Sequence, residues 1–118
     1  MFKPGVGIHY NVSNLEQTLA FYTEKLGFKE LYYNANNRQA MLTTNTKDCL
    51  IGFAESQSLV PSSTCITFEV DNIEQAVQTL QQKGIHFKDG IFEVPGVVKL
   101  ASFFDPDGYK LMLSEASM

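Results

Sequence analysis

One segment of the chain is nearly repeated later in the sequence, and this repeat constrains the fold more than any other feature. The first copy, VSNLEQTLAFYTEKLGFKE, starts at Val12, and the second, VDNIEQAVQTLQQKGIHFKD, starts at Val70. A valine, an asparagine, a Glu-Gln pair and a lysine recur at the same spacing, and one residue is lost before the glycine that follows. A chain of 118 residues has the length of one domain, so the repeat predicts two copies of one supersecondary unit.

Both copies of the repeat predict an amphipathic helix with recognisable ends. Apolar residues recur at helical spacing as Leu15, Leu19, Tyr22 and Leu26 in the first copy, and as Ile73, Val77 and Leu80 in the second. An asparagine precedes each run as a good N-cap, and a glutamine follows it three residues later, as in a capping box. A glycine follows each run and can take the left-handed conformation that ends a helix.

Alternating apolar and polar residues before each helix predict a half-buried strand. The run GVGIHYNV places His9 and Asn11 on its polar face, and the run TCITFEV places Thr67 and Glu69 on the corresponding face. Further short strands are expected at about 28–33, 38–44, 49–54, 85–88, 97–104 and 109–114. The predicted fold class is therefore α+β, with two tandem βαβββ units that form a curved mixed sheet around a cleft and carry their helices on the outer face.

The chain is expected to be a single domain over residues 1–118. The first unit spans about 1–55 and the second about 64–118, and the segment between them at about 55–63 has the proline and serines of a linker.

The polar faces of the predicted strands are the candidate ligand-binding surface. Pockets form preferentially where structural units meet, and two units that curl toward each other would enclose such a surface. The alternative is that these residues form only the solvated face of an antiparallel sheet, as most such faces do. The candidate ligand-binding residues are His9, Asn11, Thr67, Glu69, Lys110 and Met112.

Charge and composition argue against several classes of function. The net charge is −4 and Arg38 is the only arginine, so a nucleic-acid-binding surface is not expected. No apolar run approaches the about 20 residues of a membrane span, and no signal peptide opens the chain, so a cytoplasmic protein without membrane contact is expected. Cys49 and Cys65 form no metal or redox motif and are expected to be reduced thiols.

Three motifs of the chain resemble the vicinal-oxygen-chelate superfamily: HYNVSNLEQTLAFYTEKLGF, its echo TFEVDNIEQAVQTLQQKG, and FFDPDGYKLML. That group includes glyoxalase I, the bleomycin-resistance proteins and the extradiol dioxygenases. The resemblance covers the whole chain and is specific for the fold, whereas the scaffold hosts metal enzymes, thiol transferases and drug-binding proteins. Members similar to this chain usually dimerise, which implies a symmetric homodimer, either side by side or with exchanged units.

The positions that the resemblance assigns to metal ligands do not carry the expected residues. Two histidines would fall on Gly7 and Cys65, a mid-chain ligand near Gly52, and a final glutamate on Met112. Only the cysteine among these is a suitable ligand, so no metal and no other cofactor is predicted. His9 lies two residues from Gly7, about 6.6 Å along a strand, and cannot fill that position because a metal–imidazole bond is about 2.0–2.1 Å long.

Two classes of function follow from these observations. The function predicted here is a small-molecule-binding protein that sequesters a drug or metabolite without the superfamily's metal. The negative net charge favours a cationic or neutral ligand. The aromatic residues that are candidates for the walls of the binding site are Tyr32, Tyr33, Phe53 and Phe104. The alternative is a lyase, isomerase or dioxygenase-like enzyme, either metal-free with His9 as the candidate catalytic acid or base, or with a divalent metal in a displaced site of His9, Cys65 and Glu69.

Overall fold

The computed structural model describes residues 1, 6–46, 48–58 and 65–116, and the chain divides into two compact units. Unit one is Met1–Val60 and unit two is Pro61–Met118. Part of the predicted linker at about 55–63 lies outside the described residues. The prediction that the two units form a single domain stays a prediction.

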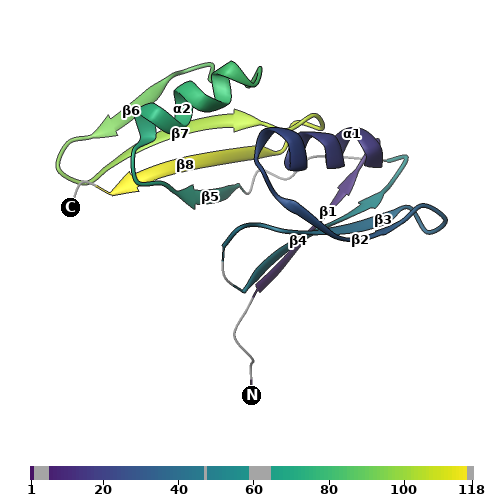
Figure 1. The fold of residues 1–118 in the computed structure, drawn as a ribbon. Coiled ribbons are helices and arrows are strands. Elements are labelled where there is room, and N and C mark those ends of the chain that lie inside the picture. Colours follow the sequence, from purple (N-terminus) through teal and green to yellow (C-terminus); the bar gives the residue numbers. More distant parts are fainter. Residues whose placement is uncertain (2–5, 47, 59–64, 117–118) are drawn as a thin grey trace. The chain divides into compact units, whose positions relative to one another are not determined.

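Unit one is a four-stranded mixed sheet with a helix packed against β3 and β4 (Figure 1). The sheet order is β1-β4-β3-β2, in which β1 and β4 run parallel and the other neighbours run antiparallel. The elements are β1 (Val6–Val12), α1 (Leu15–Ala20), the π-helical turn η1 (Phe21–Lys25), β2 (Lys29–Asn34), β3 (Gln39–Thr43) and β4 (Cys49–Glu55).

Unit two repeats this architecture with the sheet order β5-β8-β7-β6 and one parallel pair, β5 and β8. The two βαβββ units are therefore confirmed, each with its own mixed sheet. The prediction that they form one curved sheet around a cleft depends on the placement of the units and stays a prediction. The elements are β5 (Ile66–Glu69), α2 (Ile73–Gln82), β6 (Ile91–Val94), β7 (Val98–Phe104) and β8 (Lys110–Ala116).

Both helices begin with the predicted asparagine cap. Asn14 Oδ1 accepts the backbone N–H of Gln17 at 2.9 Å, and Asn72 Oδ1 accepts that of Gln75 at 3.0 Å. Each bond satisfies one of the N–H groups that the first turn of a helix leaves without a partner. Neither helix in the described part of the chain has the length and apolar character of a membrane span.

The helical segments also end at the predicted glycines. Gly27 and Gly84 take the left-handed conformation, with φ of 78° and 90°. The sequence did not predict that the last turns of the first helical segment are π-helical. A π turn holds more residues than an α turn and changes which side chains face the sheet, so the adjacent Phe21 and Tyr22 are both buried.

A glutamate near the end of the fourth strand of each unit holds the start of that unit's helix. Glu55 Oε2 accepts the backbone N–H of Leu15 at 2.9 Å, and Glu115 Oε1 accepts that of Ile73 at 2.7 Å. Both helix residues are fully buried. The negative charge also lies at the positive end of the helix, where it is favourable.

An ion pair then ties each helix to the start of the third strand of its unit. Arg38 contacts Glu16 at 2.7 Å, and Lys99 contacts Glu74 at 2.8 Å. Hydrogen bonds from Arg38 are the main cause that lowers the pKa of Glu16 from 4.5 to about 2. The repeat in the sequence is thus also a repeat of tertiary contacts.

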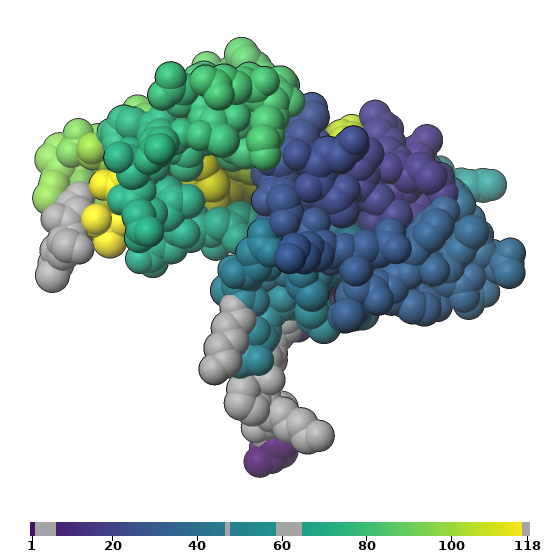
Figure 2. All heavy atoms as spheres, viewed as in Figure 1, coloured from purple at the N-terminus to yellow at the C-terminus, as the bar shows by residue number. Residues whose placement is uncertain are grey.

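The core of each unit lies between its helix and one face of its sheet. Aromatic contacts are prominent in it: the Tyr22 and Phe53 rings have centroids 4.8 Å apart in unit one, and those of Phe87 and Phe103 are 5.3 Å apart in unit two. In the space-filling view, the teal and green side chains of unit two leave only parts of its yellow last strand visible (Figure 2). The fully buried apolar residues include Val12, Leu15, Tyr22, Leu42 and Ile51 in unit one and Ile73 and Leu111 in unit two.

The predicted strand at 85–88 is wrong, because the strand at this place in unit two is Ile91–Val94. Ile85 and Phe87 are buried, as their alternation suggests, but they reach the core from an irregular segment. None of the residues of β6 is fully buried, so its sequence lacks the apolar alternation that identifies a strand.

Candidate functional site

The face of the unit-one sheet opposite its helix, here called the open face, carries the candidate site. Along β1, Val12 is fully buried on the helix side, whereas His9 and Asn11 are exposed. Successive side chains of a strand point to opposite faces, so the alternation read from the sequence places these two residues correctly.

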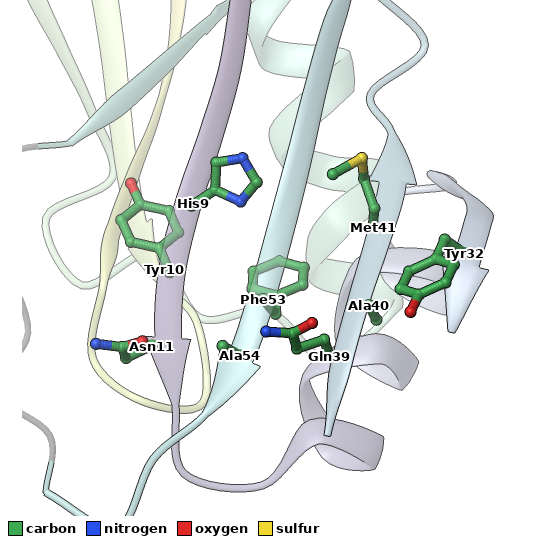
Figure 3. A pocket seen from close by; sticks show the side chains of 9 residues that line it. All are labelled: His9, Tyr10, Asn11, Tyr32, Gln39, Ala40, Met41, Phe53 and Ala54. Carbon is green, nitrogen blue, oxygen red and sulfur yellow. The ribbon is translucent and has the colours of Figure 1, made fainter. Parts of the chain in front are cut away.

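A cavity of about 250 Å³ lies on this open face. Figure 3 shows the His9 ring pointing from β1 toward β4, with Met41 of β3 and Tyr32 of β2 on the far side of β4. None of the residues that line the cavity is a carboxylate, a lysine or an arginine, and their polar groups are imidazole, phenol and amide. The lining residues are His9, Tyr10, Asn11, Tyr32, Gln39, Ala40, Met41, Phe53 and Ala54.

The His9 imidazole lies directly over Gly52, its register neighbour on the parallel strand β4. A Cβ atom added to Gly52 would be 2.5 Å from His9 Nδ1 and 2.8 Å from His9 Cε1. Gly52 is buried, and the ring occupies the volume that any side chain at this position would need. A Cβ added to Gly7 would be 3.5 Å from His9 Nε2, an ordinary contact.

Neighbouring tyrosines on β2 have different roles. Tyr32 is the register neighbour of Met41 and stays 46% exposed beside the cavity. Asn34 Nδ2 donates to its hydroxyl oxygen at 3.1 Å. Tyr33 instead donates its hydroxyl hydrogen to Glu16 of α1 at 2.6 Å, on the helix side. Of the two tyrosines predicted as aromatic walls, only Tyr32 therefore lines the cavity.

The two predicted phenylalanine walls also differ. Phe53 is 3% exposed and belongs to the core, although part of it lines the cavity. Phe104 of β7 is 54% exposed and is not among the residues lining either cavity described here.

The open face of unit two holds the other candidate residues. Thr67 of β5 is the register neighbour of Met112 of β8, and Glu69 is exposed further along β5. Lys110 and Met112 line a second cavity of about 320 Å³, but Thr67 and Glu69 do not. The prediction that these residues share one cleft with His9 and Asn11 depends on the placement of the units and stays a prediction. The other residues lining this cavity are Asp89, Gly90, Phe92, Leu100, Ala101 and Ser102.

Sequence reasoning missed Gln39 and Met41 and the role of Gly52. The alternation along β3, where Ala40 and Leu42 are buried and Gln39 and Met41 face the other way, is the signal that could have found the first two. Their approach to β1 follows from the sheet order β1-β4-β3-β2, which a pattern within one strand does not contain.

The carboxylate and cationic side chains with shifted pKa values lie in the contacts that hold the helices. A hydrogen bond from Arg38, followed by the N–H of Leu15, lowers the pKa of Glu55, and the hydrogen bond with Glu74 raises the pKa of Lys99. None of these groups lines either cavity described above. Their perturbed pKa values therefore reflect structural contacts and do not identify a catalytic acid or base.

A family model describes residues 7–113 of the chain, from the first strand to the last. The chain belongs to the glyoxalase/bleomycin resistance protein/dioxygenase superfamily. This result confirms the resemblance that the repeat and the DPDG motif suggested. Members of this superfamily share the fold but have different activities.

Similar proteins illustrate that diversity. The lactoylglutathione lyase of Salmonella typhimurium is 29% identical over an alignment of 117 positions, and this match covers 89% of this chain and 87% of that protein. The fosfomycin resistance protein FosX from Listeria monocytogenes has a TM-score of 0.82 at 19% identity and covers 100% of this chain and 97% of its own. TnmS3, an antibiotic-binding protein from Streptomyces sp. CB03234, has a TM-score of 0.81 at 22% identity, with 98% of each chain covered.

The residues at the positions that the resemblance assigns to metal ligands do not form a donor set that fits a metal ion. Gly7 and Gly52 have no side-chain donor, Met112 offers only a thioether, and Cys65 is the single suitable donor among the four. The His9 ring also fills the space in which a ligand side chain at position 52 would begin. Within each unit, the described residues include no group of three His, Cys, Asp or Glu side chains that could hold a metal. We therefore assign no reaction step to a metal.

Proposed function

We propose that this protein binds a small, uncharged molecule on the open face of unit one, with no metal taking part. The observation that carries this proposal is the chemistry of the cavity lining. His9, Asn11 and Gln39 supply hydrogen-bonding groups, and Tyr32 and Met41 supply apolar surface. A charged ligand would lose its hydration there without gaining an ionic partner from the lining residues.

The cavity size narrows the choice of ligand. Pockets that enclose drug-sized molecules typically measure about 300–1,000 Å³. A cavity of about 250 Å³ suits a molecule of one to three fused rings, or one end of a larger compound. A flat aromatic molecule with a carbonyl group would contact the Tyr32 ring and accept a hydrogen bond from an amide or the imidazole.

Thermal-shift and calorimetric titrations with coumarin and flavone test this proposal, because both compounds are flat, neutral and carry a carbonyl oxygen. Naphthalene-2-sulfonate serves as the charged aromatic control. We expect the neutral compounds to raise the melting temperature in proportion to the logarithm of their concentration. No shift with either neutral compound, or an equal shift with the sulfonate, would contradict the proposed ligand class.

Two histidine variants provide a matched pair for the same titration. His9 lines the cavity, whereas His86 is exposed in unit two and lines neither cavity. One neutral hydrogen bond contributes about 0.5–1.5 kcal/mol, so His9→Ala should weaken binding by about 2-fold to 10-fold and His86→Ala should not. Equal effects of the two substitutions would place the ligand elsewhere.

Metal content provides a separate test. The protein would be expressed with nickel, zinc, manganese and iron, purified without chelator, and compared with His9→Ala by mass spectrometry. We expect much less than one metal atom per chain in both proteins, because Gly7, Gly52 and Met112 stand where the resemblance predicts metal donors. Near-stoichiometric metal that falls in the variant would favour a displaced metal site.

The similarity to lactoylglutathione lyases supports an enzyme as the second candidate function. In that case His9 would act as an acid or base, since it is the only histidine that lines the cavity. Turnover of lactoylglutathione by the wild-type protein, lost in His9→Ala and kept in His86→Ala, would establish this alternative. We expect no turnover.

The remaining candidate residues and the assembly are also proposals. We also propose Thr67, Glu69, Lys110 and Met112 as ligand-binding residues on the corresponding face of unit two, and we propose that the chain forms a symmetric homodimer. The strands β1 and β2 are the edges of the sheet in unit one, and exposed edges favour pairing unless they are covered. Light scattering after size exclusion should give twice the 13.2 kDa of one chain, and a mass of one chain would contradict the dimer.

A further inference from the structure

We propose that Gly52 is a positioning residue for His9. Because residue 52 has no side chain, it leaves a space over β4 in which the His9 imidazole lies, and this space is here called the seat. The consequence for ligand binding rests on the function proposed above. The seat itself is a property of unit one and can be tested without a ligand.

The backbone conformation does not explain why residue 52 is a glycine. Several glycines of this chain have positive φ angles, but Gly52 is not among them. It lies inside β4, which pairs with β1 on one side and with β3 on the other. Glycine is unfavourable within a strand and often marks the close approach of another group.

The approaching group is the His9 ring. An added Cβ would lie 2.5 Å from Nδ1 and 2.8 Å from Cε1 of His9, closer than side-chain carbons approach such atoms. The next neighbour among the described residues is the carbonyl oxygen of Ala40 at 3.5 Å, an ordinary contact. An alanine at position 52 therefore conflicts with the imidazole alone. Because this ring ends an exposed side chain, it can rotate away while the strand stays folded.

In the equivalent strand pair of unit two, the large and the small side chain have exchanged strands. Thr67 and Met112 are register neighbours on the parallel strands β5 and β8, as His9 and Gly52 are on β1 and β4. In unit two the larger side chain comes from the fourth strand, and in unit one it comes from the first. Each pair thus places one large side chain over its open face, and in unit one that side chain is an imidazole.

Gly7 supplies a matched control for substitution of Gly52. A Cβ at Gly7 would meet the same imidazole, at its Nε2 atom, but at 3.5 Å. Both residues lie in strands and neither has a positive φ. Gly7→Ala and Gly52→Ala therefore add the same methyl group on either side of one ring, and only the second forces the ring to move.

NMR of protein labelled at histidine Cε1 measures the ring position directly. His9 and His86 are the only histidines, so the spectrum holds two signals, and His9→Ala assigns them. We expect a nuclear Overhauser effect between His9 Hε1 and the Gly52 Hα protons in the wild-type protein. Gly52→Ala should shift the His9 signal and leave that of His86, and Gly7→Ala should leave both nearly unchanged. An unchanged His9 signal in Gly52→Ala would overturn the proposal.

A double-mutant cycle in urea gives an independent test. Gly52→Ala should give a lower urea midpoint relative to its parent in the wild-type background than in the His9→Ala background, because only the wild-type ring has to be displaced. In the His9→Ala background the conflict is absent, so Gly52→Ala should leave the midpoint unchanged or raise it. A decrease of the same size in both backgrounds would mean that the glycine serves another purpose, and it would also overturn the proposal.

Titration with flavone links the seat to ligand binding. Displacement removes the imidazole from its present place on the cavity lining, so Gly52→Ala should weaken binding about 10-fold, whereas Gly7→Ala should change it less than about 2-fold. If wild-type protein does not bind flavone, the function proposed for this ligand fails, and the NMR and urea experiments still decide the seat. If Gly52→Ala moves the ring but leaves flavone affinity unchanged, the seat stands and its link to binding is refuted.

Discussion

Replacement of Glu115 by alanine should destabilise unit two by removing the partner of a buried backbone N–H. Glu115 Oε1 accepts the N–H of Ile73 at 2.7 Å, and Ile73 is fully buried at the first position of α2. The cap residue Asn72 already serves Gln75. In Glu115→Ala the N–H of Ile73 would therefore lose the acceptor that the structure provides.

The size of the effect follows from two contributions. A buried donor left without its acceptor costs about 1–3 kcal/mol, and loss of a negative charge at a helix N-terminus costs about 0.3–1 kcal/mol. We expect Glu115→Ala to lower the free energy of unfolding by about 2 kcal/mol. Glu115→Gln keeps an oxygen acceptor and loses only the charge, so its cost should stay below about 1 kcal/mol.

Urea unfolding followed by circular dichroism measures both variants. With a slope of about 2 kcal/mol per molar urea, Glu115→Ala should move the midpoint down by about 1 M, and Glu115→Gln by less than half of that. The two variants should have the same slope as the wild-type protein. The reasoning would be refuted by an alanine variant with the wild-type midpoint, or by equal losses in both variants, which would attribute the effect to charge alone.

Further expected outcomes concern the helix contacts and the last turn. The pKa of Glu16 falls from 4.5 to about 2 in the folded protein, so its contribution to stability is present above pH 4.5 and is lost as the pH falls toward 2. Glu16→Gln should therefore give a flatter dependence of melting temperature on pH in this range, and parallel curves would contradict this contribution. Asp105 Oδ1 accepts the N–H groups of Asp107 and Tyr109, each at 2.9 Å, so Asp105→Ala should cost about 1–3 kcal/mol in urea unfolding. Asp105→Asn, which keeps an acceptor, should cost less, and equal losses would argue against these bonds as the cause.

Local patterns predicted the helices and most strands because the responsible contacts are close in sequence. The bond from Gln17 to Asn14 spans three residues, and its counterpart in unit two spans the same distance. The strand at 85–88 was predicted wrongly because the prediction used only this local pattern. Ile85 and Phe87 alternate and are buried, but a buried alternating pair does not require strand pairing.

The candidate site was predictable only in part, because its geometry depends on pairing between distant segments. Alternation within β1 correctly placed His9 on the open face. The seat at Gly52 depends on the parallel register of β1 and β4, which lie on either side of a helix and two further strands. No pattern around Gly52 reveals which residue of β1 it meets. The resemblance predicted that no metal ligand is present near this position, but it did not predict that an imidazole fills the space.

The comparison of the two units separates the residues that hold the fold from those that define the site. The asparagine cap, the glutamate at the helix start and the ion pair to the third strand occur in both units. The open faces differ at the corresponding register positions, where unit one has His9 over Gly52 and unit two has Thr67 beside Met112. A contact needed only for folding should serve both copies alike, because each copy forms the same sheet and helix. The difference on the open faces therefore points to a role other than folding, and it is the internal reason to look for ligand chemistry at His9.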